Sequence, residues 1–294
     1  MELFVNALVE PYVYLIMKRF SFVPLSLLLF VACSKNETPV GLPEIHNEAD
    51  QSSRIEHTVL IETTLSVSCG ACPLGHHQID QIEDSLENVT HMSHYLYGPL
   101  YHDYSSYLME KINKTIYTPI GLVNRRYGGG SVVYYPINMF SGLVGNEVNE
   151  STNIGLNVSS NQTESDLELS IDVFSEEELS SSDLMLTVVL VEKIVTGIGP
   201  GYDQHNYGNS DPDHPYFAQG NYIQGFEHTN VIRHLLTAYE GDAIDISDMS
   251  TTWNGSISLT DLAESPSAYR VLAFVSESSD IVMPIINAVE FDVQ

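Results

Sequence analysis

Basic residues are scarce in this sequence. It has 11 Lys and Arg residues against 39 Asp and Glu residues in 294, a formal net charge of −28. Nucleic acids and anionic membrane surfaces are bound by basic patches, so this balance argues against both as partners. The acidity favours solubility, and by itself it identifies no partner.

Several enzyme signatures are also missing. No Ser-His-Asp order, phosphate-cradling glycine loop or basic aromatic stripe occurs in a supporting context. There is no internal repeat and no second cysteine cluster that could complete a zinc site. The sequence therefore indicates no cofactor and no metal.

Long hydrophobic runs are lacking too, because the apolar stretch from Phe20 to Ala32 is too short to span a bilayer comfortably. The basic residues Lys18 and Arg19 precede it, which is typical of a signal peptide. We therefore assign residues 1–32 to a signal region, in which an upstream stretch precedes a lipoprotein signal that starts at Met17. The run ends at Ala32-Cys33 before polar sequence, and this resembles the lipobox of bacterial lipoproteins. That resemblance implies lipidation of Cys33. An ordinary signal or an uncleaved anchor remains the alternative, and both leave the same protein outside the cytoplasm.

The mature chain divides by pattern into three parts. Residues 33–55 are polar and aperiodic, which predicts a flexible tether. Residues 56–150 alternate strand and helix patterns, which is typical of an α/β domain with parallel pairing. Residues 151–294 contain short apolar runs separated by polar turns, which predicts an antiparallel β-sandwich. An irregular insert, residues 199–225, interrupts these strands, and loops of that length are usually functional or disordered.

Cys69 and Cys72 lie between an apolar run of strand type and an amphipathic helix. If Cys33 carries lipid, they are the only thiols left, and an oxidising compartment favours a disulfide between them. A cysteine just before a helix is exposed to unpaired amides that stabilise its thiolate. We therefore expect a thioredoxin-like domain with Cys69 as nucleophile and Cys72 as resolving thiol.

Thr118-Pro119 is the second mark of such a domain. Thioredoxin-like domains place a cis-proline opposite the two cysteines, where the preceding backbone pairs with the substrate chain. Cis X–Pro bonds are rare. We predict that Pro119 is cis and that Thr118 contacts substrate, the alternative being a trans proline that starts a strand.

Five stretches together identify a resemblance: VLIETTLSVSCGACPLGHH, TPIGLVNRR, LTVVLVEK, EHTNVIRHLL and YRVLAFVSE. With the lipoprotein signal, they resemble the outer-membrane-protein-28-related lipoproteins of Gram-negative bacteria. The resemblance covers nearly all of the mature chain and implies a thioredoxin-like N-terminal part followed by a β-rich part. It also implies a lipid-anchored protein at the outer membrane, facing the periplasm or the cell surface, with exported or envelope proteins as partners.

The proton acceptor for the cysteines is the weakest part of this pattern. Thioredoxins carry a buried carboxylate six residues before the first cysteine, where this chain has Thr63. Either Glu62, one residue earlier, is the base, with a pKa raised by burial, or it points to solvent and no base is present.

Histidine and carboxylate clusters suggest metals only weakly. His76 and His77 follow Cys72 at a zinc-like spacing, yet a disulfide cannot ligate zinc, so we expect surface histidines on a helix. The insert carries Asp203, Asp211 and Asp213 without an EF-hand order, and we expect a solvated loop rather than a calcium site. Asn124, Arg125, Arg126, Asn230 and Arg233 are predicted to join the two domains by hydrogen bonds.

Two functions follow from the residues. The first is a thiol-disulfide oxidoreductase that acts on exported proteins through Cys69 and Cys72. The second is a non-enzymatic binding or assembly lipoprotein in which the same pair is an inert staple. We favour the first because so short a disulfide loop stabilises a fold little.

Overall fold

The computed structural model describes residues 55–112, 117–128, 131–132, 135–136, 139–177, 183–278 and 283–294. The predicted signal peptide, Cys33 and all of the tether except residue 55 lie outside these ranges. Within them, no helix has the length and apolarity that a membrane crossing requires.

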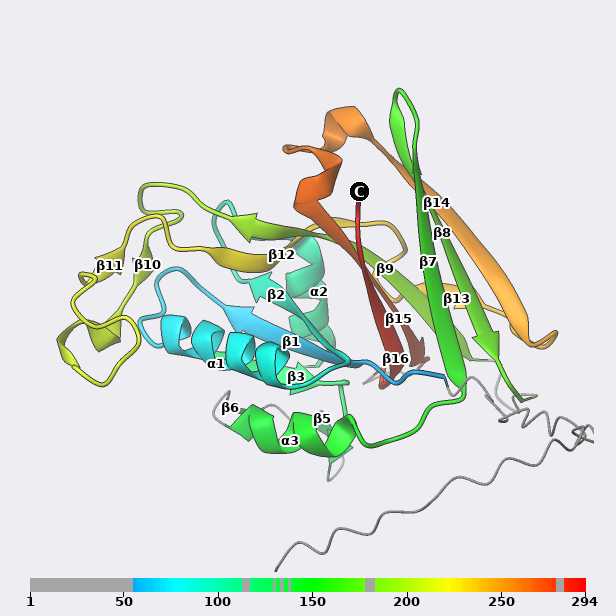
Figure 1. Ribbon diagram of the computed structural model, residues 1–294, viewed down its shortest axis with the longest axis horizontal. Coiled ribbons are helices and arrows are strands. Elements are labelled where there is room, and N and C mark those ends of the chain that lie inside the picture. Colours follow the sequence, from blue (N-terminus) through cyan, green and yellow to red (C-terminus); the bar gives the residue numbers. More distant parts are fainter. Residues whose placement is uncertain are drawn as a thin grey trace, which may run out of the picture. The chain divides into compact units, whose positions relative to one another are not determined.

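One mixed sheet of nine strands organises these residues (Figure 1). Its members are β1 (Val59–Leu65), β2 (Val89–Tyr95), β3 (Ile120–Val123), β6 (Tyr135–Pro136), β9 (Leu184–Val195), β12 (His228–Leu235), β13 (Asp242–Ile244), β15 (Tyr269–Glu277) and β16 (Ile285–Asp292). The order is β16-β15-β9-β12-β2-β1-β3-β6, with β13 paired to β9. β2 pairs parallel to β1 and to β12, and the remaining pairs are antiparallel.

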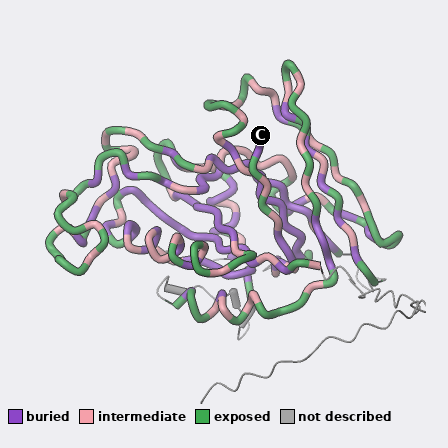
Figure 2. Tube along the Cα trace, viewed as in Figure 1, coloured by how far each residue is buried: buried purple, intermediate pink, exposed green. Residues whose placement is uncertain are grey.

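Helices cover both faces of this sheet near β1. α1 (Cys72–Ser85) and α3 (Phe140–Glu147) share a buried cluster with Val59 and Ile61, to which α1 contributes Ile79 and Ile82. α2 (Asp103–Lys111) packs Tyr104 with Leu60 in a different cluster. Alternate residues of a strand point to opposite faces, so α1 and α3 lie on one face and α2 on the other. β1 is therefore buried along its whole length, as Figure 2 shows at the centre of the sheet.

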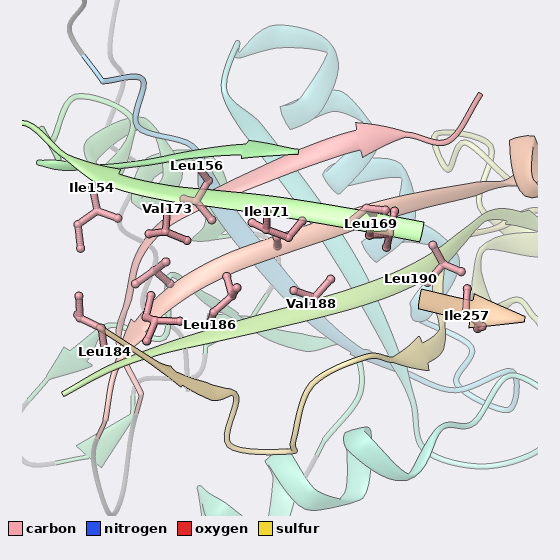
Figure 3. Close-up of a cluster of buried hydrophobic side chains, with 14 of the residues drawn as sticks. Ile154, Leu156, Leu169, Ile171, Val173, Leu184, Leu186, Val188, Leu190 and Ile257 are labelled. Atoms are coloured by element: carbon pink, nitrogen blue, oxygen red, sulfur yellow. The ribbon is translucent and has the colours of Figure 1, made fainter. Parts of the chain in front are cut away.

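A second, antiparallel sheet packs against the far half of the first. It consists of β7 (Ile154–Gln162), β8 (Asp166–Ser175) and β14 (Ser250–Ser258), with β8 in the middle. In Figure 3, Leu186 and Val188 of β9 face Ile171 and Val173 of β8. β8 alternates buried and more exposed residues, the pattern of a strand with one face in a core. Two short hairpins, β4 (Tyr127–Gly128) with β5 (Ser131–Val132) and β10 (Gln204–His205) with β11 (Tyr222–Ile223), complete the strands.

The fold is therefore rich in β-structure, with few helices among the described residues. The antiparallel strands expected after residue 150 are present and form two packed layers. Five strands of this half, β9, β12, β13, β15 and β16, nevertheless belong to the same sheet as β1 and β2, because β12 pairs with β2 at Val231 and Ser93. The boundary expected at residue 150 thus does not coincide with an edge of the large sheet. Pro136 pairs with Ile120 in β6, and α3 begins after it at Phe140.

Ile171 tests the packing of the two sheets. Its side chain is fully buried between them, so Ile171→Ala leaves a cavity and is expected to lower the free energy of unfolding by about 2–5 kcal/mol. Urea denaturation measures the change. Ser170→Ala, on the neighbouring outward-facing residue, is the control and is expected to change stability by less than about 0.5 kcal/mol.

Candidate functional site

The two cysteines lie in the turn between β1 and α1, which we call the cysteine turn (residues 66–72). Cys69 and Cys72 form a disulfide, as the sequence predicted. The pair is asymmetric, since Cys69 is partly exposed whereas Cys72 is fully buried. Cys72 is the first residue of α1, Pro73 follows it, and no side chain caps the helix or places a negative charge in its first turn. The exposed sulfur therefore precedes a helix end whose amides carry positive partial charge.

Thr118 and Pro119 lie near the same end of β1. The peptide bond between them is cis, which confirms that part of the prediction. The register of β3 against β1 pairs Ile120 with Thr64. The proline therefore lies where β1 leads into the cysteine turn. Contact of Thr118 with a substrate stays a prediction.

Glu62 is neither a base with a raised pKa nor a side chain that points to solvent, so both expectations for it are wrong. Its carboxylate is buried and accepts two hydrogen bonds from Arg125, at 2.6 Å from Nε and 2.7 Å from Nη2. Burial alone would raise the pKa of Glu62, but the Arg125 guanidinium and its hydrogen bonds outweigh burial and lower the pKa to about 2. A carboxylate so firmly ionised does not exchange protons near neutrality.

The position of Glu62 on β1 explains the error. Even-numbered residues of β1 face α2, whereas α1 and Cys72 lie on the other face. Glu62 accordingly joins His94 at 3.3 Å, and Arg125 also donates to the Tyr104 hydroxyl at 2.8 Å. Thr63, like the other odd-numbered residues of β1, points toward the α1 face, so the position six residues before Cys69 carries a hydroxyl there.

His76 is not a surface residue, contrary to our expectation. Its Nε2 lies 3.0 Å from the Tyr95 hydroxyl, which lies 2.8 Å from Nδ1 of His228, and Nε2 of His228 donates to the carbonyl of Tyr202 at 2.9 Å. All three side chains of this His76–Tyr95–His228 network are buried. Burial, and then His228, lower the pKa of His76 to about 3. His77, its neighbour on α1, is half-buried and outside the network.

The insert (residues 199–225) packs against the cysteine turn, a contact that no sequence motif predicted. Its Gln204 side chain is fully buried, and Nε2 lies 3.2 Å from the carbonyl of Val67 and 2.8 Å from that of Cys69. The backbone amide of Tyr207 donates to the carbonyl of Gly70 at 2.9 Å. The Tyr207 ring lies so close to Gly70 that a side chain there would collide with it. The composition of the insert had suggested a functional loop, but Gln204 itself carried no signal.

A hollow of about 430 Å³ adjoins the exposed side of the turn. It is lined by Val67, Ser68, Pro200, Asp203 and Tyr222. The turn and the insert therefore form its walls together.

Several other polar residues of the insert bond within it, although Nδ1 of His205 lies 3.3 Å from the carbonyl of Ser68 in the cysteine turn. Asn206 donates to the carbonyls of Tyr216 and Gly220, and Asp211 accepts from the amide of Asp213. Across the described ranges, no three His, Cys, Asp or Glu side chains are grouped to hold a metal ion.

Of the residues expected to join the two domains, some bond across the two halves of the chain and others bond within the first half. Asn230 lies 3.3 Å from His91, and Arg233 donates to the carbonyl of Pro99, so these two do connect the halves of the chain. Arg125 and Arg126 instead pair with Glu62 and Glu147 within the first half.

Comparison with known proteins gives one family and a small set of solved structures. The model of the outer membrane protein Omp28 family matches residues 108–291. HBP35 of Porphyromonas gingivalis is 18% identical and has a TM-score of 0.65 over 81% of this chain and 76% of its own. A domain of the outer membrane lipoprotein Omp28 from Porphyromonas gingivalis is 12% identical, with a TM-score of 0.31 over 49% of this chain and 89% of its own. No curated protein matches. The likeness to HBP35 shows the fold alone, and the family match begins after the cysteine turn.

Glu62→Gln tests the buried ion pair. It leaves the Arg125 charge buried without its partner, so the free energy of unfolding is expected to fall by about 3–5 kcal/mol. Because the folded pKa of Glu62 is lowered from 4.5 to about 2, the wild-type protein gains this stability above pH 4.5 and loses it as the pH falls toward 2. Denaturant titrations across that range measure both effects. Glu240→Gln, which removes an exposed pair with Lys111, is the control and is expected to have no measurable effect. Equal effects of the two variants would contradict this account.

Gly70→Ala tests the closure of the insert. The added methyl group collides with the Tyr207 ring and so destabilises the closed position of the insert. The free energy required to open the insert is therefore expected to fall by about 1–3 kcal/mol. Hydrogen exchange of the Tyr207 amide measures it. Adding Tyr207→Ala removes the collision and serves as the control. If exchange is as slow in Gly70→Ala as in the wild type, the insert does not pack as described.

Proposed function

The chain belongs to the outer membrane protein Omp28 family, and on that premise we propose that it is an envelope lipoprotein that exchanges disulfides with exported proteins. The asymmetry of the Cys69–Cys72 disulfide carries the proposal. A partly exposed sulfur just before a helix can be attacked by a partner thiolate, or can attack a partner disulfide when it is reduced. The buried Cys72, three residues further on, then resolves the mixed disulfide.

The finer architecture belongs to the same proposal. Residues 56–150 form a thioredoxin-like unit in which a strand, the cysteine turn and a helix are followed by a strand, a helix and the cis-proline strand. Residues 151–294 form its β-rich partner. Cys33 carries the lipid that attaches the chain to the outer membrane, as the sequence before it suggests.

The roles in the exchange follow from exposure. Cys69 is the nucleophile, because it is the more exposed of the two cysteines, and Cys72 is the resolving thiol. The backbone of Thr118, held by the cis bond to Pro119, is the position at which a substrate chain pairs. Substrates enter beside Ser68, where the hollow adjoins the turn. Glu62 has no part in this chemistry.

One observation favours a second candidate, a binding or assembly lipoprotein with an inert disulfide. Gln204 braces the carbonyls of the cysteine turn, and Tyr207 covers Gly70. A turn held in this way resists the movement that disulfide exchange requires. Reduction potential separates the two functions, because structural disulfides have potentials below about −300 mV whereas catalytic ones lie higher.

Cys72→Ala tests the exchange. The variant is expected to retain partner proteins as mixed disulfides at Cys69, because the resolving thiol is gone. Non-reducing electrophoresis of envelope extracts, with and without a reductant, detects the adducts. Cys69→Ala is the matched control and is expected to retain none, since Cys72 is buried. Absence of adducts from Cys72→Ala, together with a potential below about −300 mV, would establish the inert disulfide instead.

A further inference from the structure

The buried position of Cys72 creates a requirement that the proposed function leaves unmet. A thiol attacks a disulfide as its thiolate, so Cys72 must lose its proton before it resolves a mixed disulfide at Cys69. Its side chain is fully buried, so water is a poor acceptor there. Glu62, the carboxylate that the sequence suggested, lies on the other face of β1.

The His76–Tyr95–His228 network lies on the face where an acceptor is needed. Cys72 and His76 are separated by one turn of α1, and both are buried, so they share a helix face. Side chains on a helix lean toward its N-terminus, which directs the His76 ring toward Cys72. Tyr95 belongs to the same buried cluster as Cys72 and Leu65.

The carbonyl at the end of the network determines where its protons lie. A carbonyl oxygen only accepts, so Nε2 of His228 carries a proton and donates to Tyr202. Burial lowers the pKa of His228, so its ring is neutral near pH 7 and its Nδ1 accepts the Tyr95 proton. The Tyr95 oxygen then accepts from Nε2 of His76. With its proton on Nε2, the neutral His76 ring keeps a lone pair on Nδ1.

We infer that the His76–Tyr95–His228 network takes the proton of Cys72 during resolution of the mixed disulfide, an inference that rests on the proposed function. The Cys72 thiol gives its proton to Nδ1 of His76, Nε2 of His76 gives its proton to Tyr95, and Tyr95 gives its own to Nδ1 of His228. Cys72 is left as a thiolate and His228 as a cation. The thiolate then forms the Cys69–Cys72 bond, and the partner leaves as a thiolate with the electron pair of the broken disulfide.

The surroundings favour His228 over His76 as the residue that holds the positive charge after the transfer. Burial and the neighbouring His228 lower the pKa of His76 to about 3, so that ring passes the proton on. The Tyr202 carbonyl opposes the effect of burial on His228 and favours its protonated form. Burial raises the pKa of Tyr95, so the hydroxyl between the rings stays protonated at rest.

The other titratable groups around the network come from three elements and the insert. His91 from β2 and Arg233 from β12 disfavour a second positive charge. Asp80 from α1 is half-buried, and burial raises its pKa. Tyr216 of the insert packs on Phe226, which in turn contacts both histidine rings. None of these groups lies within the chain of hydrogen bonds from His76 to Tyr202.

The rate of resolution with glutathione tests the inference. The reduced protein is mixed with oxidised glutathione, and acid-quenched mass spectrometry follows the glutathione adduct of Cys69 as it converts to the Cys69–Cys72 disulfide. Tyr95→Phe and His228→Gln are expected to slow this conversion about a hundredfold near pH 7, the usual contribution of a positioned proton acceptor. The variant rates should rise about tenfold per pH unit, as direct removal of the proton by hydroxide requires, while the wild-type rate changes less.

His77→Gln is the matched control, because it alters the adjacent histidine of α1 outside the network, and it is expected to leave the rate and its pH profile unchanged. Wild-type rates and pH profiles in Tyr95→Phe and His228→Gln would overturn the inference. If circular dichroism shows that both variants are unfolded, the resolution rate of the wild-type protein is measured instead in mixtures of light and heavy water. A linear dependence of rate on deuterium fraction overturns the inference, and a curved one, which several moving protons produce, supports it.

The same assay separates this inference from the proposed function. Cys72→Ala is expected to form a stable glutathione adduct at Cys69. If it forms none, the proposed function fails. If it forms the adduct and the network variants resolve theirs at the wild-type rate, only the inference fails.

Discussion

Burial of β1 on both faces is the constraint on which the rest of the structure depends. Each residue from Val59 to Leu65 is enclosed, with α1 and α3 on one side and α2 on the other. A strand in that position has no solvent-facing side on which a charge can be hydrated. Glu62 is tolerated because Arg125 meets it with two hydrogen bonds and Tyr104 and His94 complete the cluster.

The pairing of β12 with β2 brings the second half of the chain to the cysteine turn. β12 begins at His228, three residues after the insert, and Nδ1 of His228 lies 2.8 Å from the Tyr95 hydroxyl of the neighbouring strand β2. The same connection lays Gln204 and Tyr207 of the insert against the turn. The surroundings of the disulfide are thus assembled from both halves, although both cysteines come from the first.

The chemistry of the site depends on a contrast between its two sulfurs. Cys69 is partly exposed and follows Ser68, which lines the hollow, whereas Cys72 is buried in a cluster with Leu65, Val67 and Tyr95. The Omp28 family match covers residues 108–291 and so does not include the cysteine turn. The geometry of the turn and of the groups that surround it therefore carries the proposed function.

The sequence by itself determined the local features of this protein. It predicted the Cys69–Cys72 disulfide, the cis bond before Pro119, the order of strands and helices around them, and the β-rich second half, because these follow from spacing and periodicity along one segment. Only the tertiary structure decided that Glu62 pairs with Arg125, that His76 is buried, and that Gln204 braces the cysteine turn. Each of these depends on residues that are distant in the chain and adjacent in space. The face of a strand or helix that becomes enclosed is set by what packs on it, and periodicity within that element cannot reveal its partner.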